Sequence, residues 1–478
     1  MYNLYNFIPT GTLEPLFDQL EQSDITEKSF ASVAIIGQEL LAADELQPAI
    51  TVLESSLQLG TDDLSLKGSV YSALSNAYWK TNNIKRALHF MHQDLLTVEG
   101  LNDTNGICRV HGNLGNAYFC QNQLTDAEHH HQKQLDTALK EEDTYQAAAA
   151  LTALGHVHVA SNDYEKALSS HKRSAVLFQQ CKCSLKEAKE LASVGAVYAL
   201  MNDYENAVKC QEESLKIIMD LDDPEEICNA MSLLGGLYQN TKKYEQASKT
   251  FQEMFKISQE SEDYENQCRA LSGLGASYRA QGKLKTAENC HEQQLKIAIE
   301  VKDRELESKA QSDLGVTYHE KGEYTKALEY HKSFLESCRT IDDREGESKA
   351  YGHIGNAYQY MEQYERAVKY YKLGLSLVRD QNDLHLEASL HGDLASSYQA
   401  LMMTTEALQH FQEQLKIAID LKDLKLESKA EYDLGMWFLK EFICLFISKY
   451  LIRFQTVINE SFTFTFKRKK HLRDIITL

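Results

Sequence analysis

Residues that interrupt helices are scarce in this sequence. Proline occurs only 4 times in 478 residues, and glycine 23 times. Proline removes a backbone hydrogen-bond donor, and glycine costs about 1 kcal/mol relative to alanine inside a helix. The chain is long enough for several ordinary domains or for one extended array. So few helix breakers over this length favour helix throughout and predict an all-α fold.

The sequence also lacks an excess of positive charge. Its 70 acidic and 50 basic residues give a net charge of −20. Binding to nucleic-acid phosphates requires a basic surface, so a general nucleic-acid binder is disfavoured. An acidic balance of this size mainly contributes to solubility.

Long apolar runs are missing as well. The longest candidate, residues 436–454, is interrupted by Lys440, Glu441, Lys449 and Arg453, so no membrane span is expected. The start, MYNLYNFIPTGT, has no basic segment followed by an apolar run, which argues against a signal peptide. The 10 cysteines are therefore predicted to be reduced thiols of a cytoplasmic protein.

Motifs that carry chemistry are absent from the sequence. It contains no glycine-rich phosphate loop, no nucleophile elbow and no metalloprotease helix motif. Paired carboxylates such as Asp222-Asp223 and Asp342-Asp343 fall in predicted turns, where they are expected to cap helices. The sequence therefore predicts neither an enzyme nor a bound cofactor.

What the sequence does contain is a repeat of 40 residues. A glycine recurs at this period, with the small residues Ser75 and Ala395 in the remaining places. The glycines are Gly115, Gly155, Gly195, Gly235, Gly275, Gly315, Gly355 and Gly435. An aliphatic residue precedes each one, as Leu114 does, an aromatic ring usually follows three residues later, as Tyr118 does, and an alanine follows after twelve, as Ala127 does.

This spacing predicts a helical hairpin in each repeat. Leu at i, Gly at i+1 and Tyr at i+4 share one face of a first helix, helix A, of about 15 residues. The glycine is expected where a longer second helix, helix B, approaches closely, with the alanine as the other half of that contact. A single hairpin cannot bury its apolar face alone, whereas stacked neighbours do so in a solenoid.

The domain organisation follows from the repeat. We predict an N-terminal extension at 1–23, a degenerate capping repeat at 24–63, nine 40-residue units at 64–423, a half repeat at 424–438 and an atypical tail at 439–478. In the degenerate unit, Ala49 takes the place of the repeated alanine with a slip of two residues. Terminal repeats are often atypical because they cap the stack.

The Leu-Gly-x-x-Tyr of helix A and the alanine of helix B resemble the tetratricopeptide repeat signature. The 40-residue period and helix B text such as YEKALSSHK are similar to the variant found in G-protein regulators of the Pins type and in long scaffolds linked to the spindle, midbody and cytokinesis. This resemblance implies a right-handed superhelix that binds proteins.

A second resemblance, to those mitotic scaffolds, rests on sequence segments that are not part of the repeated pattern. It includes VAIIGQELLAADELQPAITVLE and GSVYSALSNAYW, and it extends collinearly from about Leu13 to Met436. It implies a cytoskeleton-associated mitotic scaffold with a kinase partner of the Aurora type. The pattern stops within a helix A near Trp437, so we expect a truncated isoform or an annotation artefact such as intron read-through.

The resemblance also implies which residues face a partner. With the repeated glycine as position 8, positions 2, 5, 9, 12 and 13 of helix A would line a concave groove. Basic residues at positions 2 and 12 with asparagines at position 9 suit an extended acidic peptide, because cations bind carboxylates and amides pair with peptide groups. The candidate contacts are Asn76, Arg109, Asn116, Lys189, Arg269, Arg279, Lys309, Lys349 and Asn356. The alternative is that position 2 is a solvated surface site.

Histidines and cysteines suggest metal chemistry only at first sight. The tract His129-His130-His131 resembles a metal site, but position 131 recurs as a histidine or aromatic ring in other repeats, which predicts a helix B packing position. Cys181 and Cys183 lack the second pair of a zinc site. The other cysteines, which recur at the same positions of different repeats, are expected to be small core residues.

The tail from Leu439 differs from the repeats. Residues 462–466 alternate like a strand, and 467–470 form a basic cluster. It is either a membrane-surface or nuclear-import element, or non-native sequence after a truncation. The sequence as a whole predicts a peptide-binding scaffold of mitosis or the cytoskeleton, at the spindle or midbody. The alternatives are a Pins-like polarity adaptor and, on the tail alone, a membrane-tethered adaptor.

Overall fold

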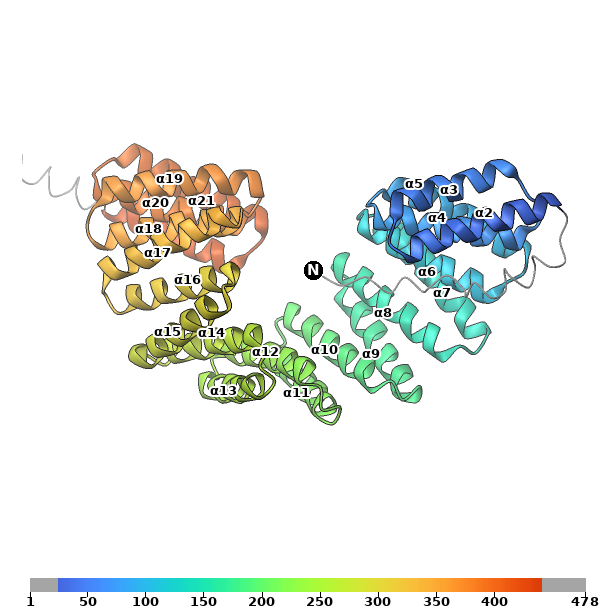
Figure 1. Ribbon diagram of the computed structural model, residues 1–478. Coiled ribbons are helices and arrows are strands. Elements are labelled where there is room, and N and C mark those ends of the chain that lie inside the picture. Colours follow the sequence, from blue (N-terminus) through green and yellow to red (C-terminus); the bar gives the residue numbers. More distant parts are fainter. Residues whose placement is uncertain (1–24, 441–478) are drawn as a thin grey trace, which may run out of the picture. The chain divides into compact units, whose positions relative to one another are not determined.

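The computed structural model describes residues 25–440, with side chains from residue 29 onward, and consists there of consecutive helical hairpins without strands (Figure 1). The chain divides into an N-terminal unit, Met1–Lys243, and a C-terminal unit, Tyr244–Leu478. Within each unit, every helix packs against the helices before and after it in sequence. The predicted all-α solenoid is confirmed.

The described helices of the N-terminal unit are α2 (Ile25–Ala42), α3 (Leu46–Leu59), α4 (Leu64–Lys80), α5 (Ile84–Gly100), α6 (Thr104–Cys120), α7 (Leu124–Lys140), α8 (Thr144–Ala160), α9 (Tyr164–Gln180), α10 (Ser184–Leu200), α11 (Tyr204–Met219) and α12 (Pro224–Asn240). Those of the C-terminal unit are α13 (Tyr244–Glu260), α14 (Tyr264–Ala280), α15 (Leu284–Val301), α16 (Arg304–Glu320), α17 (Tyr324–Thr340), α18 (Arg344–Tyr360), α19 (Tyr364–Gln381), α20 (Leu384–Ala400) and α21 (Thr404–Leu421). Residues 424–440 are also helical. Helices with even numbers are helices A, and those with odd numbers are helices B.

From α4 to α21 the two helices of a hairpin differ in length by at most one residue, so the expectation of a clearly longer helix B is wrong. Helices α8 and α9 both have 17 residues. Most turns contain a residue with positive φ, as at Asn162 (60°) and Asn202 (61°), and this residue recurs about every 20 positions. The next amide then reaches back to the helix, as Asp163 N does to His158 O at 2.8 Å. The turn within a hairpin and the turn between hairpins therefore share one backbone conformation, which recurs every half repeat.

Aspartates cap most helices A, as the turn pattern predicts. Asp103 accepts a hydrogen bond from the Gly106 amide, and Asp343 accepts one from the Gly346 amide. The paired carboxylates at 222–223 and 342–343 thus act through helix capping at the second member of each pair. Helix α10 is an exception, because Cys183 replaces the aspartate and makes no side-chain cap.

The repeated glycine makes room for a ring rather than for the alanine in most repeats. A Cβ built on Gly155 would lie 2.5 Å from the His171 ring, and one on Gly355 would lie 2.5 Å from the Tyr371 ring. At Gly195, by contrast, the alanine supplies the nearest atom, the Ala207 carbonyl oxygen at 3.1 Å. The predicted glycine–alanine contact is thus corrected: the ring sixteen residues after the glycine occupies the space that a Cβ would need.

The same packing reaches the first hairpin. A Cβ on Gly37 would lie 2.6 Å from Leu53, which also follows its glycine by sixteen residues, and Ala49 is fully buried. The segments 1–23 and 441–478 lie outside the described residues, together with the strand-like piece 462–466 and the basic cluster 467–470. The domain limits given above stay a prediction.

Candidate site on the helix-A face

All nine candidate contacts lie on helices A, on a surface that we call the helix-A face. In the N-terminal unit, Asn76 lies on α4, Arg109 and Asn116 on α6, and Lys189 on α10. In the C-terminal unit they are Arg269 and Arg279 on α14, Lys309 on α16, and Lys349 and Asn356 on α18. Each of the nine is half-buried or exposed. The two sets belong to different units and form two separate candidate surfaces.

Polar side chains connect successive helices A across this face. In the N-terminal unit, Arg109 Nη1 donates to Ser72 Oγ at 2.7 Å, which joins α6 to α4. In the C-terminal unit, Ser272 Oγ donates to Asp313 Oδ2 at 2.7 Å, which joins α14 to α16. Successive helices A therefore approach each other closely along this face in both units.

Most of the candidate cations already have an acidic partner within the protein. Lys189 Nζ lies 2.6 Å from Glu226, Arg269 lies 2.8 Å from Glu265 and Lys349 pairs with Glu345. These three cations keep 54%, 33% and 47% of their side-chain surface exposed, respectively. Ion pairs this accessible contribute about 0–1 kcal/mol, so a competing carboxylate exchanges with them readily.

Arg109 is bound differently from the other cations. Its Nη2 lies 3.2 Å from Asp94 Oδ2, and the Asp94 side chain is only 3% exposed. Burial raises the pKa of Asp94 to about 6, against the opposing effect of Arg109. Removing Arg109 would leave a buried carboxylate without its cation, which is costly. Arg109 therefore holds α6 against α5, and its fixed position limits any exchange of partners.

Asn356 and Gly112 of the helix-A face have structural roles of their own. Asn356 Oδ1 accepts a hydrogen bond from the buried Tyr371 hydroxyl at 2.5 Å. At position 5, a Cβ on Gly112 would lie 2.9 Å from the Gln134 amide. Asn76 and Asn116 are half-buried on α4 and α6. The lack of a side chain at Gly112 thus admits a glutamine from helix B, beside any effect on a bound peptide.

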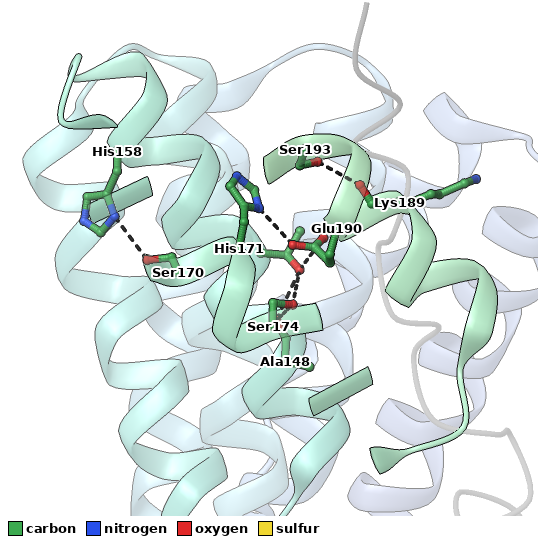
Figure 2. Close-up of polar contacts among 9 residues, drawn as sticks. Ala148, His158, Ser170, His171, Ser174, Lys189, Glu190 and Ser193 are labelled. Carbon is green, nitrogen blue, oxygen red and sulfur yellow. Dashed lines mark hydrogen bonds and ion pairs between the residues drawn. The ribbon is translucent and has the colours of Figure 1, made fainter. Parts of the chain in front are cut away.

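A buried network beneath Lys189 was missed by the sequence reasoning (Figure 2). Glu190 Oε2 lies 2.8 Å from His171 Nδ1, and Glu190 Oε1 accepts a hydrogen bond from Thr152 at 2.9 Å. Ser174 lies 2.9 Å from Thr152 Oγ1 and donates to the Ala148 carbonyl at 2.9 Å. His171 is 1% exposed and Glu190 5%. The network links α8, α9 and α10.

The sequence does carry a signal for this network. Glu190 occupies position 3 of helix A, where the other repeats have alanine, valine or leucine. That column reads Val70, Val110, Ala150, Glu190, Ala230, Ala270, Ala310, Ala350, Leu390 and Ala430. A single acid in an apolar column indicates a buried carboxylate with a specific partner.

The histidines of helix B are packing residues, as predicted. His131, His171, His291 and His331 are at most 2% exposed. In the tract at 129–131, His130 Nδ1 instead lies 3.0 Å from His111 Nδ1. Among residues 25–440 there is no cluster of three or more histidine, cysteine or acidic side chains arranged to hold a metal ion.

The cysteines of the described part are free thiols. Burial raises the pKa of Cys108 and that of Cys268 to about 11, which keeps both in the neutral form. With Cys228 and Cys290, which are also buried, they match the prediction of small core residues, whereas Cys210 is half-buried. Over the described helices, none is both long and apolar enough to cross a bilayer.

Comparison with known proteins identifies the family to which these helical hairpins belong. Residues 106–180, 190–260, 226–300 and 306–380 match the tetratricopeptide repeat family, together more than half of the chain. The chain belongs to the tetratricopeptide repeat family. Tetratricopeptide repeat proteins generally act as non-catalytic scaffolds for protein interactions, which agrees with the stacked hairpins described above.

Two relatives match the resemblances seen in the sequence. Tetratricopeptide repeat protein 28 of Homo sapiens is 43% identical over 102 residues, which is 21% of this tetratricopeptide repeat chain and 4% of the relative. G-protein-signaling modulator 1 of Mus musculus is 33% identical over 87 residues, which is 18% of this chain and 13% of the relative. The chain therefore matches only a small part of either relative's length. Collinearity from Leu13 to Met436 stays a prediction.

Proposed function

We propose that this tetratricopeptide repeat chain is a non-catalytic scaffold that binds extended, acidic segments of partner proteins on its helix-A face. The observation that carries the proposal is the set of solvent-accessible, exchangeable cations on helices A, one on α10 in the N-terminal unit and others on α14, α16 and α18 of the C-terminal unit. Lys189, Arg269 and Lys349 form ion pairs that stay open to solvent. An acidic segment replaces the intramolecular acids at small cost and adds backbone hydrogen bonds.

The cellular setting of the proposal rests on similarity to tetratricopeptide repeat protein 28. We propose a role in mitosis, cytokinesis or cytoskeletal organisation, in the cytoplasm and at the cytoskeleton, spindle or midbody, with a mitotic kinase of the Aurora type among the partners. Similarity to G-protein-signaling modulator 1 favours the second candidate, a Pins-like polarity adaptor in G-protein signalling. Proximity labelling in dividing cells separates the two: recovery of Gα subunits supports the adaptor, and recovery of spindle or midbody proteins supports the mitotic scaffold.

Charge reversal of the helix-A face tests the binding surface. The test variant changes Arg269, Arg279, Lys309 and Lys349 to Glu. The control changes Lys256, Lys296, Lys332 and Lys416 to Glu, four exposed lysines of helices B in the same unit, and so alters the net charge equally. We expect affinity capture followed by mass spectrometry to lose partners with the first variant alone. An unchanged partner list, or equal loss with both variants, would contradict the assignment.

A further inference from the structure

Two pairs of histidines face each other at equivalent places in the two units. In the C-terminal unit, His391 Nδ1 on α20 lies 2.9 Å from His410 Nδ1 on α21. In the N-terminal unit, His111 Nδ1 on α6 lies 3.0 Å from His130 Nδ1 on α7. Each pair joins helix A to helix B of one hairpin, and none of the four histidines is a candidate contact of the helix-A face.

Histidine occurs at these two positions only as a pair. Position 4 of helix A reads Tyr71, His111, Leu151, Leu191, Met231, Leu271, Gln311, Tyr351, His391 and Glu431. The position three residues after the repeated alanine of helix B reads Phe90, His130, Ser170, Cys210, Thr250, Cys290, Tyr330, Tyr370 and His410. Packing at both positions accepts many side chains, yet histidine stands at both in the same two repeats and at neither in the others. The two rings therefore act together.

The distance between the two Nδ1 atoms matches that between two ligands of one metal ion. Imidazole nitrogens bind Zn²⁺ at about 2.0–2.1 Å, so two of them at neighbouring corners of its coordination shell are about 2.9–3.4 Å apart. In the protein, one ring donates to the other through these atoms, which holds the rings at 2.9 Å in the C-terminal pair. The pair thus already has the spacing that an ion requires.

Both rings of the C-terminal pair are in the neutral form that binds metals. Burial is the main cause that lowers the pKa of His391 and that of His410 to about 4. Coordination through both Nδ1 atoms places the proton of each ring on Nε2. His391 Nε2 lies 3.9 Å from Glu387 Oε1, and a carboxylate beside the second nitrogen is usual for a metal-binding histidine. His410 is half-buried, which gives an ion access from solvent.

One charged residue distinguishes the two pairs. Glu413 on α21 lies near both rings of the C-terminal pair, where its charge opposes the effect of burial on their pKa. Lys133 stands at the same place beside the N-terminal pair and adds to the effect of burial in lowering the pKa of His111. A dication is therefore attracted at the C-terminal pair and repelled at the N-terminal one.

Two cations also lie near His410, and each is engaged elsewhere. Arg379 Nε lies 3.2 Å from Glu387 Oε1. Lys372 Nζ lies 5.5 Å from the centre of the Tyr398 ring, which is stacked on His410. The carboxylates of Glu387 and Glu413 equal these cations in number, so the surroundings of the C-terminal pair carry no excess of positive charge.

We propose that His391 and His410 bind a transition-metal dication that prefers imidazole, such as Zn²⁺ or Ni²⁺, between their Nδ1 atoms. Water completes the coordination, and the charge of Glu413 favours the ion. Two protein ligands agree with the absence of any larger group of metal-binding side chains from residues 25–440. The ion joins α20 to α21 and so stabilises one hairpin, independently of peptide binding on the helix-A face.

Isothermal titration calorimetry of the full chain with Ni²⁺ tests the site near pH 7. The variant His391→Gln removes one ligand, and Gln311 shows that glutamine fits this position. We expect it to weaken Ni²⁺ binding at least about tenfold, and Glu413→Lys, which copies Lys133, to weaken it about tenfold. His111→Gln in the N-terminal pair is the matched control and should change the affinity less than about twofold.

The change in melting temperature with Ni²⁺ provides a second measurement. The ion should raise the melting temperature of the wild type more than that of His391→Gln, because it binds the folded hairpin alone. Circular dichroism confirms that each variant is folded.

Three outcomes would overturn the site. These are Ni²⁺ binding by His391→Gln as tight as that of the wild type, equal losses with His391→Gln and His111→Gln, or an equal rise in melting temperature for wild type and His391→Gln. Charge reversal of the helix-A face leaves both histidines in place, so failure of the metal site and failure of the scaffold function are observed separately.

Discussion

His171 in the N-terminal unit and His331 in the C-terminal unit occupy the same place in their repeats and differ in their hydrogen bonding. Both follow their glycine by sixteen residues, pack against it and are 1% exposed. His171 Nδ1 lies 2.8 Å from Glu190, whereas His331 Nδ1 has no partner. The position of the ring is thus independent of its polar contact.

The difference arises from one residue of the following helix A. Glu190 follows His171 by nineteen residues, and Ala350 stands at the same distance after His331. The space beside them differs too, because Ser174 in the first repeat corresponds to Phe334 in the second. Packing of helices and rings is therefore a property of the repeat, whereas polar connections belong to individual repeats.

Transferring the carboxylate tests this explanation most severely. We expect Ala350→Glu to destabilise the protein by about 4 kcal/mol, because Ala350 is fully buried and the bulky, buried Phe334 stands where the other repeat has Ser174. The double variant with Phe334→Ser should recover part of the loss. Urea unfolding followed by circular dichroism measures both, and no recovery would show that the neighbouring side chain is not the obstacle.

The pH dependence of stability distinguishes the packing of a helix B histidine ring, such as that of His131, from its protonation. Burial lowers the pKa of His131 to about 4 in the folded chain. Because the unfolded value is higher, the folded state keeps its full stability above about pH 6.5 and loses up to about 3 kcal/mol as the pH falls toward 4.

His131→Phe removes this contribution, and other repeats already place phenylalanine there, as at Phe251. We expect the unfolding free energy of the variant to increase relative to that of the wild type as the pH falls from 6.5 to 4. A difference that is constant across this range would contradict the buried, neutral state of His131.

Removal of Glu190, the hydrogen-bond partner of His171 in the N-terminal unit, has an intermediate effect on stability. We expect Glu190→Ala to cost about 2 kcal/mol, since His171 and Thr152 lose a buried acceptor. Chemical denaturation measures the cost, with Glu226→Ala, which removes the half-buried partner of the exposed Lys189, as the control. A loss no larger than that of the control would show that the network is not stabilising.

A methyl group on the repeated glycine tests how firmly each ring is held. A Cβ would lie 2.5 Å from His171 at Gly155 and 2.4 Å from His331 at Gly315. We expect Gly155→Ala to destabilise by about 2 kcal/mol and Gly315→Ala by about 1, because the Glu190 contact prevents the His171 ring from moving. Gly236→Ala, with open space at its Cβ, should stabilise slightly. Melting temperatures give the order, and the reverse order would argue against polar anchoring.

The smallest effect concerns the turns of the two units. Met402 in the C-terminal unit has φ of 61° and is 84% exposed, whereas Asn162 holds the equivalent conformation in the N-terminal unit. We expect Met402→Asn to stabilise by about 0.5 kcal/mol, since asparagine tolerates the left-handed region better. Thermal unfolding detects the gain, and a loss would indicate that Met402 has a packing role.

The sequence predicts the parts of the structure that depend on periodicity. Hairpins, buried alanines, aspartate caps and packed histidines follow from residues that recur at fixed spacing. Some ion pairs could also be predicted from the sequence, because Glu265 and Arg269 are four residues apart on one helix. The pair of Lys189 with Glu226 joins two repeats and depends on how closely their helices approach. The ring beside the glycine was missed because side-chain size alone does not show which residue enters the gap.

Contacts between helices that are close in sequence give each unit a particular mechanical behaviour. Within a unit, each hairpin packs on the one before it, and in most repeats a ring lies beside the glycine of its own hairpin. Under tension applied at the ends, a hairpin is therefore released without dismantling those far from it. Each release adds about 140 Å of contour length for a 40-residue hairpin, so the array responds to force in steps of one size.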